Sequence, residues 1–103
     1  MLDIARCDMI VRVWRCRISS AEGFREFTDK DALPILRSQE GCIAAYVGLD
    51  DLQNGIVVTV WRDLESLRRF AGDDWREPVI HPNEVKLLAE KPKVEHYTLV
   101  GML

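Results

Sequence analysis

The sequence predicts an α+β fold of the ferredoxin-like type, with the order β-α-β-β-α-β, an antiparallel four-stranded sheet and both main helices on one face. Three observations lead to this prediction. Four segments are rich in β-branched and aromatic residues or alternate apolar with polar positions. Two segments with helical spacing separate the first strand from the second and the third from the fourth. The length of 103 residues allows one domain.

The first strand is predicted over residues 9–18, MIVRVWRCRI, which lie between Asp8 and the pair Ser19-Ser20. Ser20 is a suitable N-cap for a helix that reaches about residue 37. The apolar residues of that helix fall near one face: Phe24, Phe27 and Leu36. Pro34 is expected either to kink the helix or to confine it to the residues before Leu33.

The second and third strands are predicted at residues 42–50 and 56–61. Asn54-Gly55 between them is the residue pair typical of a two-residue hairpin turn. Asp63 is a candidate N-cap for the next helix, because Leu64, Leu67 and Ala71 then share a face, and Gly72 should end it.

A short helix that begins at Pro82 and contains Val85 and Leu88 is predicted to end before Pro92. Residues 93–101 alternate as a fourth strand. One face of this strand should carry Val94, His96, Thr98 and Val100.

Both faces of the predicted sheet are apolar. Ile56, Val58 and Val60 alternate with Val57, Thr59 and Trp61, and the first strand sets Val11 and Val13 opposite Ile10, Trp14 and Ile18. The helices can cover only one face, and the other would expose an apolar surface that is large for a monomer. The pattern therefore predicts a homodimer in which a second copy covers this face.

Composition excludes several classes of protein. A net charge of −3 without a basic stripe argues against nucleic-acid binding. Cys7, Cys16 and Cys42 are odd in number and form no CxxC pair, so we expect no disulfide framework, no zinc site and a cytoplasmic location. No segment has the run of about 18 apolar residues that a membrane helix needs, and charges interrupt the first segment as they would not in a signal peptide.

The segments MIVRVWRCRIS, TVWRDLESLRRFAGDDW, PVIHPNE and VEHYTLVG, in this order and spacing, resemble the antibiotic biosynthesis monooxygenase superfamily of dimeric α/β barrels, and above all its small uncharacterised bacterial members. The resemblance runs from about Met9 to Val100. It implies a domain over residues 9–101, preceded by an N-terminal extension over residues 1–8. The superfamily includes cofactor-independent oxygenases of aromatic polyketides, haem-degrading enzymes, quinol oxygenases and members without a known reaction.

The resemblance to the haem-degrading branch is incomplete. That branch has an Asn on the first strand, where this chain has Trp14 and no Asn between residues 9 and 18. Phe70 stands where that branch has a helix Trp, and His81 is offset by one residue from the position of its iron ligand. Haem binding and haem degradation are therefore disfavoured.

Two histidines are candidate catalytic residues. His96 is predicted on an apolar strand face, where it is either a hydrogen-bonded core imidazole or a general base or proton donor. His81 precedes Pro82 and either serves only the local turn or reaches a ligand. An imidazole can do proton chemistry near neutral pH.

Aromatic residues mark the expected substrate-binding site. A solvated connector over residues 70–82, FAGDDWREPVIHP, would not need Phe70 and Trp75, whereas the wall of a pocket would place them against a flat ligand. Trp14, Trp61 and Tyr46 on the strands are further candidates, with core or dimer interface as the alternative. Strand arginines either form ion pairs at the sheet end or hold an anionic or enolate oxygen: Arg12, Arg15, Arg17 and Arg62.

No nucleotide, nucleophile-elbow or metal-ligand motif is present. The sequence therefore predicts a monooxygenase-like protein without a cofactor or a metal, which acts on a small aromatic or quinone compound between sheet and helices. The alternative is a non-catalytic binder or a structural homodimer of the same fold.

Overall fold

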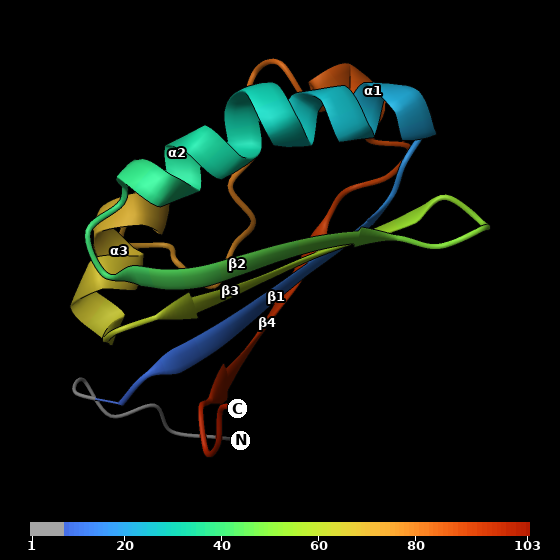
Figure 1. Cartoon of the computed structure of the whole chain (residues 1–103). Coiled ribbons are helices and arrows are strands. Elements are labelled where there is room, and N and C mark those ends of the chain that lie inside the picture. Colours follow the sequence, from blue (N-terminus) through green and yellow to red (C-terminus); the bar gives the residue numbers. More distant parts are fainter. Residues whose placement is uncertain (1–7) are drawn as a thin grey trace.

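A computed structural model describes residues 8–103 and shows a single antiparallel sheet with its helices on one side (Figure 1). The sheet has the strand order β2-β3-β1-β4. Its strands are β1 (Ile10–Arg17), β2 (Cys42–Leu49), β3 (Asn54–Trp61) and β4 (Lys93–Thr98). The predicted ferredoxin-like α+β class is confirmed.

The helices α1 and α2 run end to end across the sheet, and α3 lies at the end where β3 finishes (Figure 1). A π-helical turn, Thr28–Ala32, joins the first two, and a 3-10 turn, Val85–Leu87, precedes β4. The α-helices are α1 (Ala21–Phe27), α2 (Leu33–Ser38) and α3 (Leu64–Ala71).

Local side-chain chemistry starts and stops these helices as expected. The Ser20 hydroxyl accepts a hydrogen bond from the Gly23 N–H at 3.0 Å, and the Asp63 carboxylate accepts one from the Ser66 N–H at 2.8 Å. Gly72 ends α3 with φ of 89°, a conformation that glycine adopts without the Cβ clash of other residues.

Pro34 does not stop the first helical segment, so the expectation that the helix ends before Leu33 is wrong. The chain passes through the π-helical turn Thr28–Ala32 and continues as α2 to Ser38. Pro34 lies in the first turn of α2, directly after the π-helical turn, so the helical hydrogen-bond pattern is already irregular where this residue lacks an N–H.

The predicted Asn54-Gly55 turn is also wrong. Both residues are part of β3, where Asn54 pairs with Arg17 and Gly55 with Cys16. The turn lies earlier, at residues 50–53, because the Asp50 side chain accepts the N–H groups of Leu52 at 2.9 Å and Asn54 at 2.8 Å. An aspartate that binds the backbone two residues ahead is a turn former in its own right.

Two further boundaries differ from expectation. The helix predicted after Pro82 is only the 3-10 turn, and β4 ends at Thr98, so Val100 lies beyond the sheet and is exposed. Inside β4 the alternation is as predicted, and the register sets His96 opposite Arg12 and Tyr97 opposite Val11.

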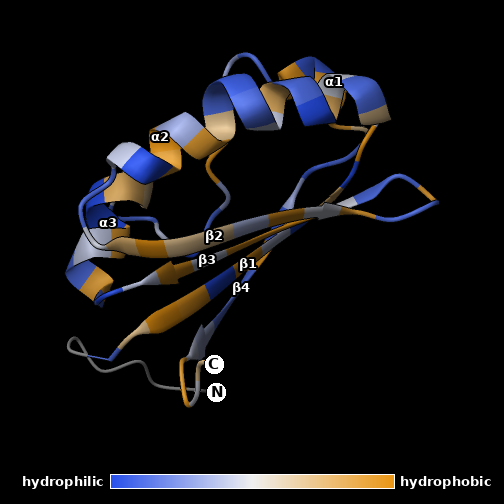
Figure 2. Ribbon diagram, viewed as in Figure 1, coloured by the Kyte–Doolittle hydropathy of each residue, from blue (hydrophilic) through white to orange (hydrophobic). Residues whose placement is uncertain are grey.

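The pairing register separates two apolar faces. Strand residues on the helix-covered face include Ile10, Trp14, Trp61 and Leu49, which belong to or pack against the two core clusters. The opposite face is formed by Val11, Val13, Ala44, Tyr46, Val58, Val60 and Tyr97. No helix among residues 8–103 covers this second face, and apolar colour runs along the sheet strands in Figure 2.

Candidate ligand site

A cavity of about 280 Å³ lies between the helix-covered face of the sheet and the helical layer. The sheet contributes Arg12, Trp14, Val57 and Thr59, and the helical layer contributes Phe27, Ala32, Ile35, Leu36 and Phe70. The segment after α3 supplies the remaining wall with Val79, Ile80, His81, Pro82 and Glu84. Most of these side chains are apolar, as is usual for small-molecule sites.

Arg12 is the central polar group of this cavity. Arg12 is the third residue of β1 and is only 4% exposed, although it carries a charge. Its Nη1 donates to the Trp75 carbonyl oxygen and to His96 Nε2, and its Nη2 donates to the Glu77 carbonyl oxygen at 3.0 Å. Burial lowers the pKa of Arg12 to about 10, which leaves the guanidinium charged at neutral pH.

His96 is held as a neutral acceptor. Its Nε2 lies 2.8 Å from Arg12 Nη1, and because arginine only donates hydrogen bonds, the imidazole proton must be on Nδ1. Burial, together with the nearby charges of Arg12 and Arg76, lowers the pKa of His96 to about 4. The ring also meets Trp75 edge to face, at a centroid distance of 4.8 Å.

Trp75 anchors the segment that follows α3. Its indole is buried, and it contacts the His96 ring and the guanidinium of Arg76, whose Cζ lies 4.3 Å from the ring centroid. Its carbonyl and that of Glu77 are both bound by Arg12. Arg12 therefore fixes the first part of the segment whose later residues wall the cavity.

His81 and Glu84 form a compact polar unit at that wall. The His81 N–H donates to Glu84 Oε1 at 2.8 Å, and the Glu84 N–H donates back to the His81 carbonyl at 3.0 Å. The Asn83 N–H donates to His81 Nδ1 at 3.0 Å, so the neutral ring carries its proton on Nε2. Glu84 is only 7% exposed, and burial raises the pKa of its carboxyl group.

The aromatic side chains form a layered floor. Phe70 lines the cavity and stacks on Trp61 at 5.1 Å between centroids. Trp61 in turn donates from Nε1 to Thr59 Oγ1 at 2.9 Å. Trp14 lines the cavity and stacks on Phe24 at 6.4 Å. The two aromatic side chains of the cavity, Phe70 and Trp14, are therefore each packed against a core aromatic ring.

The structure brings some of the predicted site residues together and separates others. His81, Phe70 and Trp14 line the cavity, whereas Trp75 and His96 lie against Arg12 and not on the cavity surface. Trp61 lies beneath Phe70. Tyr46 is on the opposite sheet face and is 63% exposed, so it does not contact this cavity.

The remaining strand arginines behave differently from Arg12. Arg15 pairs with Glu95 in solvent, and Arg62 lies 3.4 Å from Asp63 and 3.6 Å from Glu40. These are the ion pairs at the sheet surface that the sequence left as one alternative. Of the four strand arginines, Arg12 alone lines the cavity between sheet and helices.

Sequence reasoning missed Glu84 and Thr59. Glu84 is the last residue of the PVIHPNE segment, but nothing in the sequence distinguishes a buried glutamate from a solvated one. Thr59 is predicted to share a strand face with Val57 and Trp61, as the register shows, but not to line a cavity. The only local signal for the His81–Glu84 unit is the order of its residues: a histidine directly before a proline, followed three positions later by a glutamate.

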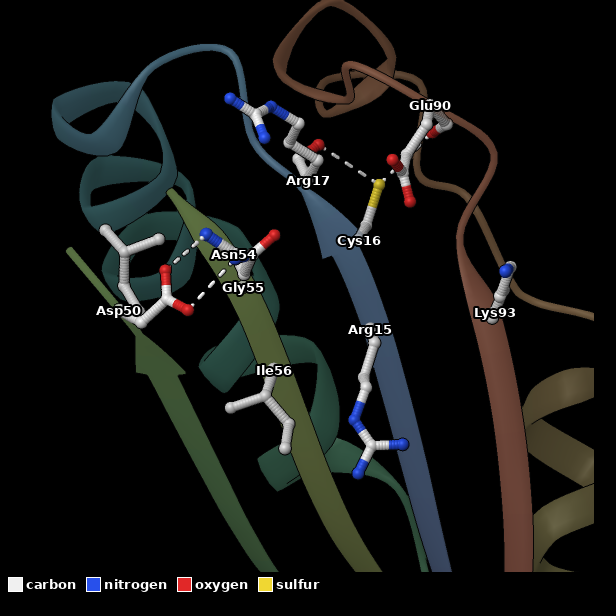
Figure 3. Close-up of a pocket in the computed structure, with 10 residues that line it drawn as sticks. Arg15, Cys16, Arg17, Asp50, Asn54, Gly55, Ile56, Glu90 and Lys93 are labelled. Atoms are coloured by element: carbon white, nitrogen blue, oxygen red, sulfur yellow. Dashed lines mark hydrogen bonds between the residues drawn. The ribbon is translucent and has the colours of Figure 1, made fainter. Parts of the chain in front are cut away.

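A second hollow, of about 600 Å³, lies at the end of the sheet where β1 finishes (Figure 3). Its polar groups bind one another: Cys16 Sγ donates to the Glu90 carbonyl at 3.1 Å, and Asn54 Nδ2 donates to Asp50 Oδ2 at 3.0 Å. The basic side chains around it, Arg15, Arg17 and Lys93, come from the outward-facing side of the strands. The charged residues that line this hollow are all exposed, whereas Arg12 in the first cavity is buried.

Within residues 8–103, no three His, Cys, Asp or Glu side chains gather where they could hold a metal ion. Cys16 and Cys42 are free thiols, and Cys7 lies outside the described residues. The helices of the described part of the chain are all too short or too polar to cross a membrane.

No protein-family model and no curated protein sequence matches this chain. Solved structures do match it over almost their full length. A protein of unknown function from Nitrosomonas europaea, NE2512, superposes with a TM-score of 0.76 at 15% identity, over 96% of each chain. A protein from Caulobacter crescentus, provisionally assigned as an antibiotic biosynthesis monooxygenase, gives 0.74 at 15% identity, over 95% of this chain and 94% of that one.

A mutant form of SnoaB, a cofactor-independent oxygenase from Streptomyces nogalater, gives a TM-score of 0.68 at 17% identity, over 93% of this chain and 97% of its own. At such identities the agreement concerns backbone architecture and not chemistry. The chain therefore has the ferredoxin-like α+β fold of the antibiotic biosynthesis monooxygenase-like proteins, the fold that its sequence resemblance indicates.

Proposed function

We propose that this chain binds a small planar aromatic or quinone compound in the cavity between sheet and helices and oxidises it with O₂ without flavin or metal. The cavity itself is the observation that carries the proposal. Apolar and aromatic walls surround a few polar groups, Arg12, His81 and Glu84, and this is the usual composition of a small-molecule site. Two structural neighbours, one provisionally assigned as a monooxygenase and the other a cofactor-independent oxygenase, support the proposal at the level of the fold.

The proposed reaction needs only a proton acceptor and a dry cavity. Loss of a proton from an electron-rich ring leaves a carbanion or phenolate, whose electrons reduce O₂ as a C–O bond forms. The resulting hydroperoxide loses water and leaves a carbonyl group, so that a CH₂ group and O₂ become C=O and H₂O. The substrate supplies the electrons, and O₂ is the oxidant.

We assign proton transfer in this reaction to His81. His81 reaches the cavity, and it can take the substrate proton on Nε2 once the Asn83 N–H releases Nδ1 and the ring proton moves to that nitrogen. His96 is the weaker candidate, because its Nε2 lone pair accepts a hydrogen bond from Arg12 and its pKa is lowered to about 4. Phe70 and Trp14 would pack against the ring of the ligand.

The test is O₂ consumption by the purified protein with a panel of phenols, quinols and anthrones. His81→Asn should keep ligand affinity and lower turnover by about 10² to 10⁴, the usual contribution of general acid–base catalysis. Asp73→Asn, on the exposed surface after α3, is the matched control and should leave turnover unchanged. A panel that gives no O₂ uptake above the rate without protein would contradict the proposal.

The second candidate is a non-catalytic binder of the same compounds. It is favoured by one observation: a ring nitrogen of each histidine already accepts a hydrogen bond from within the chain. Saturable binding of an aromatic compound without any O₂ uptake would distinguish this function from an oxygenase.

We also propose a homodimer in which the sheet faces meet. The face opposite the helices carries Val11, Val58 and Val60 in its centre and Tyr46 and Tyr97 towards its edges. Tyr46 and Tyr97 are exposed. Val13 and Val60 are already buried within the single chain, and a second copy would cover the accessible remainder of this face, which includes Tyr46, Tyr97 and the half-buried Val58. We place the protein in the cytoplasm, because the thiols of Cys16 and Cys42 suit a reducing compartment.

A further inference from the structure

Arg12 carries a charge that no acidic group in the described part of the chain balances. Within residues 8–103, no carboxylate oxygen lies within 4.0 Å of its guanidinium nitrogens, whereas Arg15, Arg62 and Arg68 all have such a partner. The partners of Arg12 are two backbone carbonyls and a neutral imidazole. Arg12 is nevertheless the least exposed of these arginines, at 4%.

Burying a guanidinium without a counter-charge is unfavourable, because the low-dielectric interior replaces its hydration only in part. The lowered pKa of Arg12 reports the same cost from burial. Carbonyl dipoles offset some of it, but a neutral acceptor offsets less than an anion does. The site would therefore gain stability from an anion placed beside Arg12.

The guanidinium also has donors to spare. Arginine carries five N–H groups, and the hydrogen bonds to Trp75, His96 and Glu77 engage three of them. In the described part of the chain the other two, Nε–H and one N–H of Nη2, have no acceptor. Arg12 is one of the residues that line the cavity, so a ligand bound there could accept hydrogen bonds from these two N–H groups.

We propose that the cavity takes its planar ligand as an oxyanion, with the charged oxygen, from a carboxylate or from a phenolate or enolate, bound to Arg12. This inference rests on the proposed function and adds to it the charge of the substrate. The apolar walls, such as Ile35 and Val57, would then enclose the uncharged part of the ring.

The other ionisable groups near the cavity permit this arrangement. Glu84 is the only carboxyl group among the lining residues; it forms no ion pair with Arg12, and burial raises its pKa, which favours the uncharged form. The ring of His81 lies at the same wall as Glu84. Arg76 lies over the Trp75 ring and adds positive charge near His96, whose pKa it helps to lower.

The test compares probes of one size and different charge by calorimetry. The probes are 4-nitrophenolate, benzoate, the neutral nitrobenzene and the non-aromatic cyclohexanecarboxylate. Wild-type protein should bind at least one aromatic anion about tenfold or more tightly than nitrobenzene. The absorbance of bound 4-nitrophenol should show its pKa lowered by about one unit, which corresponds to the same tenfold preference for the ionised form.

Arg12→Met should abolish this preference, and Arg12→Lys should retain part of it, because a lysine keeps the charge but not the planar set of donors. Arg25→Met is the control: it removes one positive charge from the exposed surface of α1 and should keep the preference. The comparison of probes on the wild-type protein needs no variant, so it stands even if Arg12→Met fails to fold.

The outcomes separate this inference from the proposed function. Equal binding of nitrobenzene and both aromatic anions would overturn the inference and leave the aromatic site intact. Binding of cyclohexanecarboxylate alone, lost in Arg12→Met, would support the anion site and contradict an aromatic substrate. Absence of binding by all four probes would overturn both. Preference for benzoate over 4-nitrophenolate, or the reverse, would identify which oxyanion the site accepts.

Discussion

Replacing His96 with glutamine should make the protein more resistant to mild acid. His96 is kept neutral in the folded chain, with Nε2 accepting from Arg12 and a pKa lowered from 6.5 to about 4. In the unfolded chain the same imidazole is protonated below about pH 6.5. The unfolded state therefore binds more protons than the folded state, and stability falls as the pH decreases from about 6.5 towards 4.

The size of this effect follows from the two pKa values. Between pH 7 and pH 5, a histidine with pKa 6.5 unfolded and about 4 folded costs the fold about 1.8 kcal/mol at most. The value is an upper limit, because part of the His96 ring is accessible to water, which screens the neighbouring charges. Glutamine keeps an oxygen acceptor for Arg12 and does not titrate.

The assay is urea unfolding of wild type and His96→Gln at pH 7 and pH 5, with the free energy of unfolding extrapolated to water. Wild type should lose more stability than the variant on acidification, by about 1 to 1.8 kcal/mol. Carboxylates titrate equally in both proteins, so the difference isolates His96. The reasoning would be refuted by identical losses, which would mean that the imidazole accepts a proton without leaving Arg12.

Three further predictions concern the dimer, the cavity and a helix cap. Light scattering of the wild type should give about twice the chain mass of 11.9 kDa, as expected for a dimer with an interface of about 1,600 Å². Val58→Glu, on the face opposite the helices, should give the monomer. A monomeric wild type at micromolar concentration would contradict the proposed assembly. Ala32→Trp should fill the cavity and weaken binding of an aromatic ligand by about tenfold or more, with far-ultraviolet circular dichroism unchanged; unchanged affinity would place the ligand elsewhere. Asp63→Ala should lower the free energy of unfolding in urea by about 1 kcal/mol, because the N-cap hydrogen bond from Ser66 is lost. The control Asp51→Ala, in the exposed turn between β2 and β3, should leave it almost unchanged. Equal effects of the two substitutions would show that the cap is not the cause.

Features that depend on a few neighbouring residues could be predicted from the sequence. The caps at Ser20 and Asp63, the stop at Gly72 and the alternation of β3 are all local, and each is confirmed. The turn between β2 and β3 is predicted at the wrong residues because two turn signals, Asp50 and the pair Asn54-Gly55, lie within six residues of each other. Asp50 binds the backbone of residues 52 and 54 and so leaves Asn54-Gly55 to the strand.

The site could be predicted only in part, because it depends on contacts between distant segments. Arg12 and His96 are neighbours only through the register of β1 with β4, and the carbonyls of Trp75 and Glu77 reach Arg12 from a segment without regular structure. The sequence singles out Phe70 and His81, which line the cavity, because aromatic residues in a connector are unusual. Glu84 was not found, because burial of a single carboxyl group has no signature in the sequence.

The position of Arg12 has a consequence for how such a protein could change its ligand during evolution. The cation stands on the central pair of strands, whereas Val79, Ile80 and Pro82 belong to an irregular segment that tolerates substitution and changes of length. Substitutions in this segment could therefore change the shape of the cavity while the positive charge of Arg12 on β1 stayed in place. The sheet would preserve one chemical preference, and the loop would diversify around it.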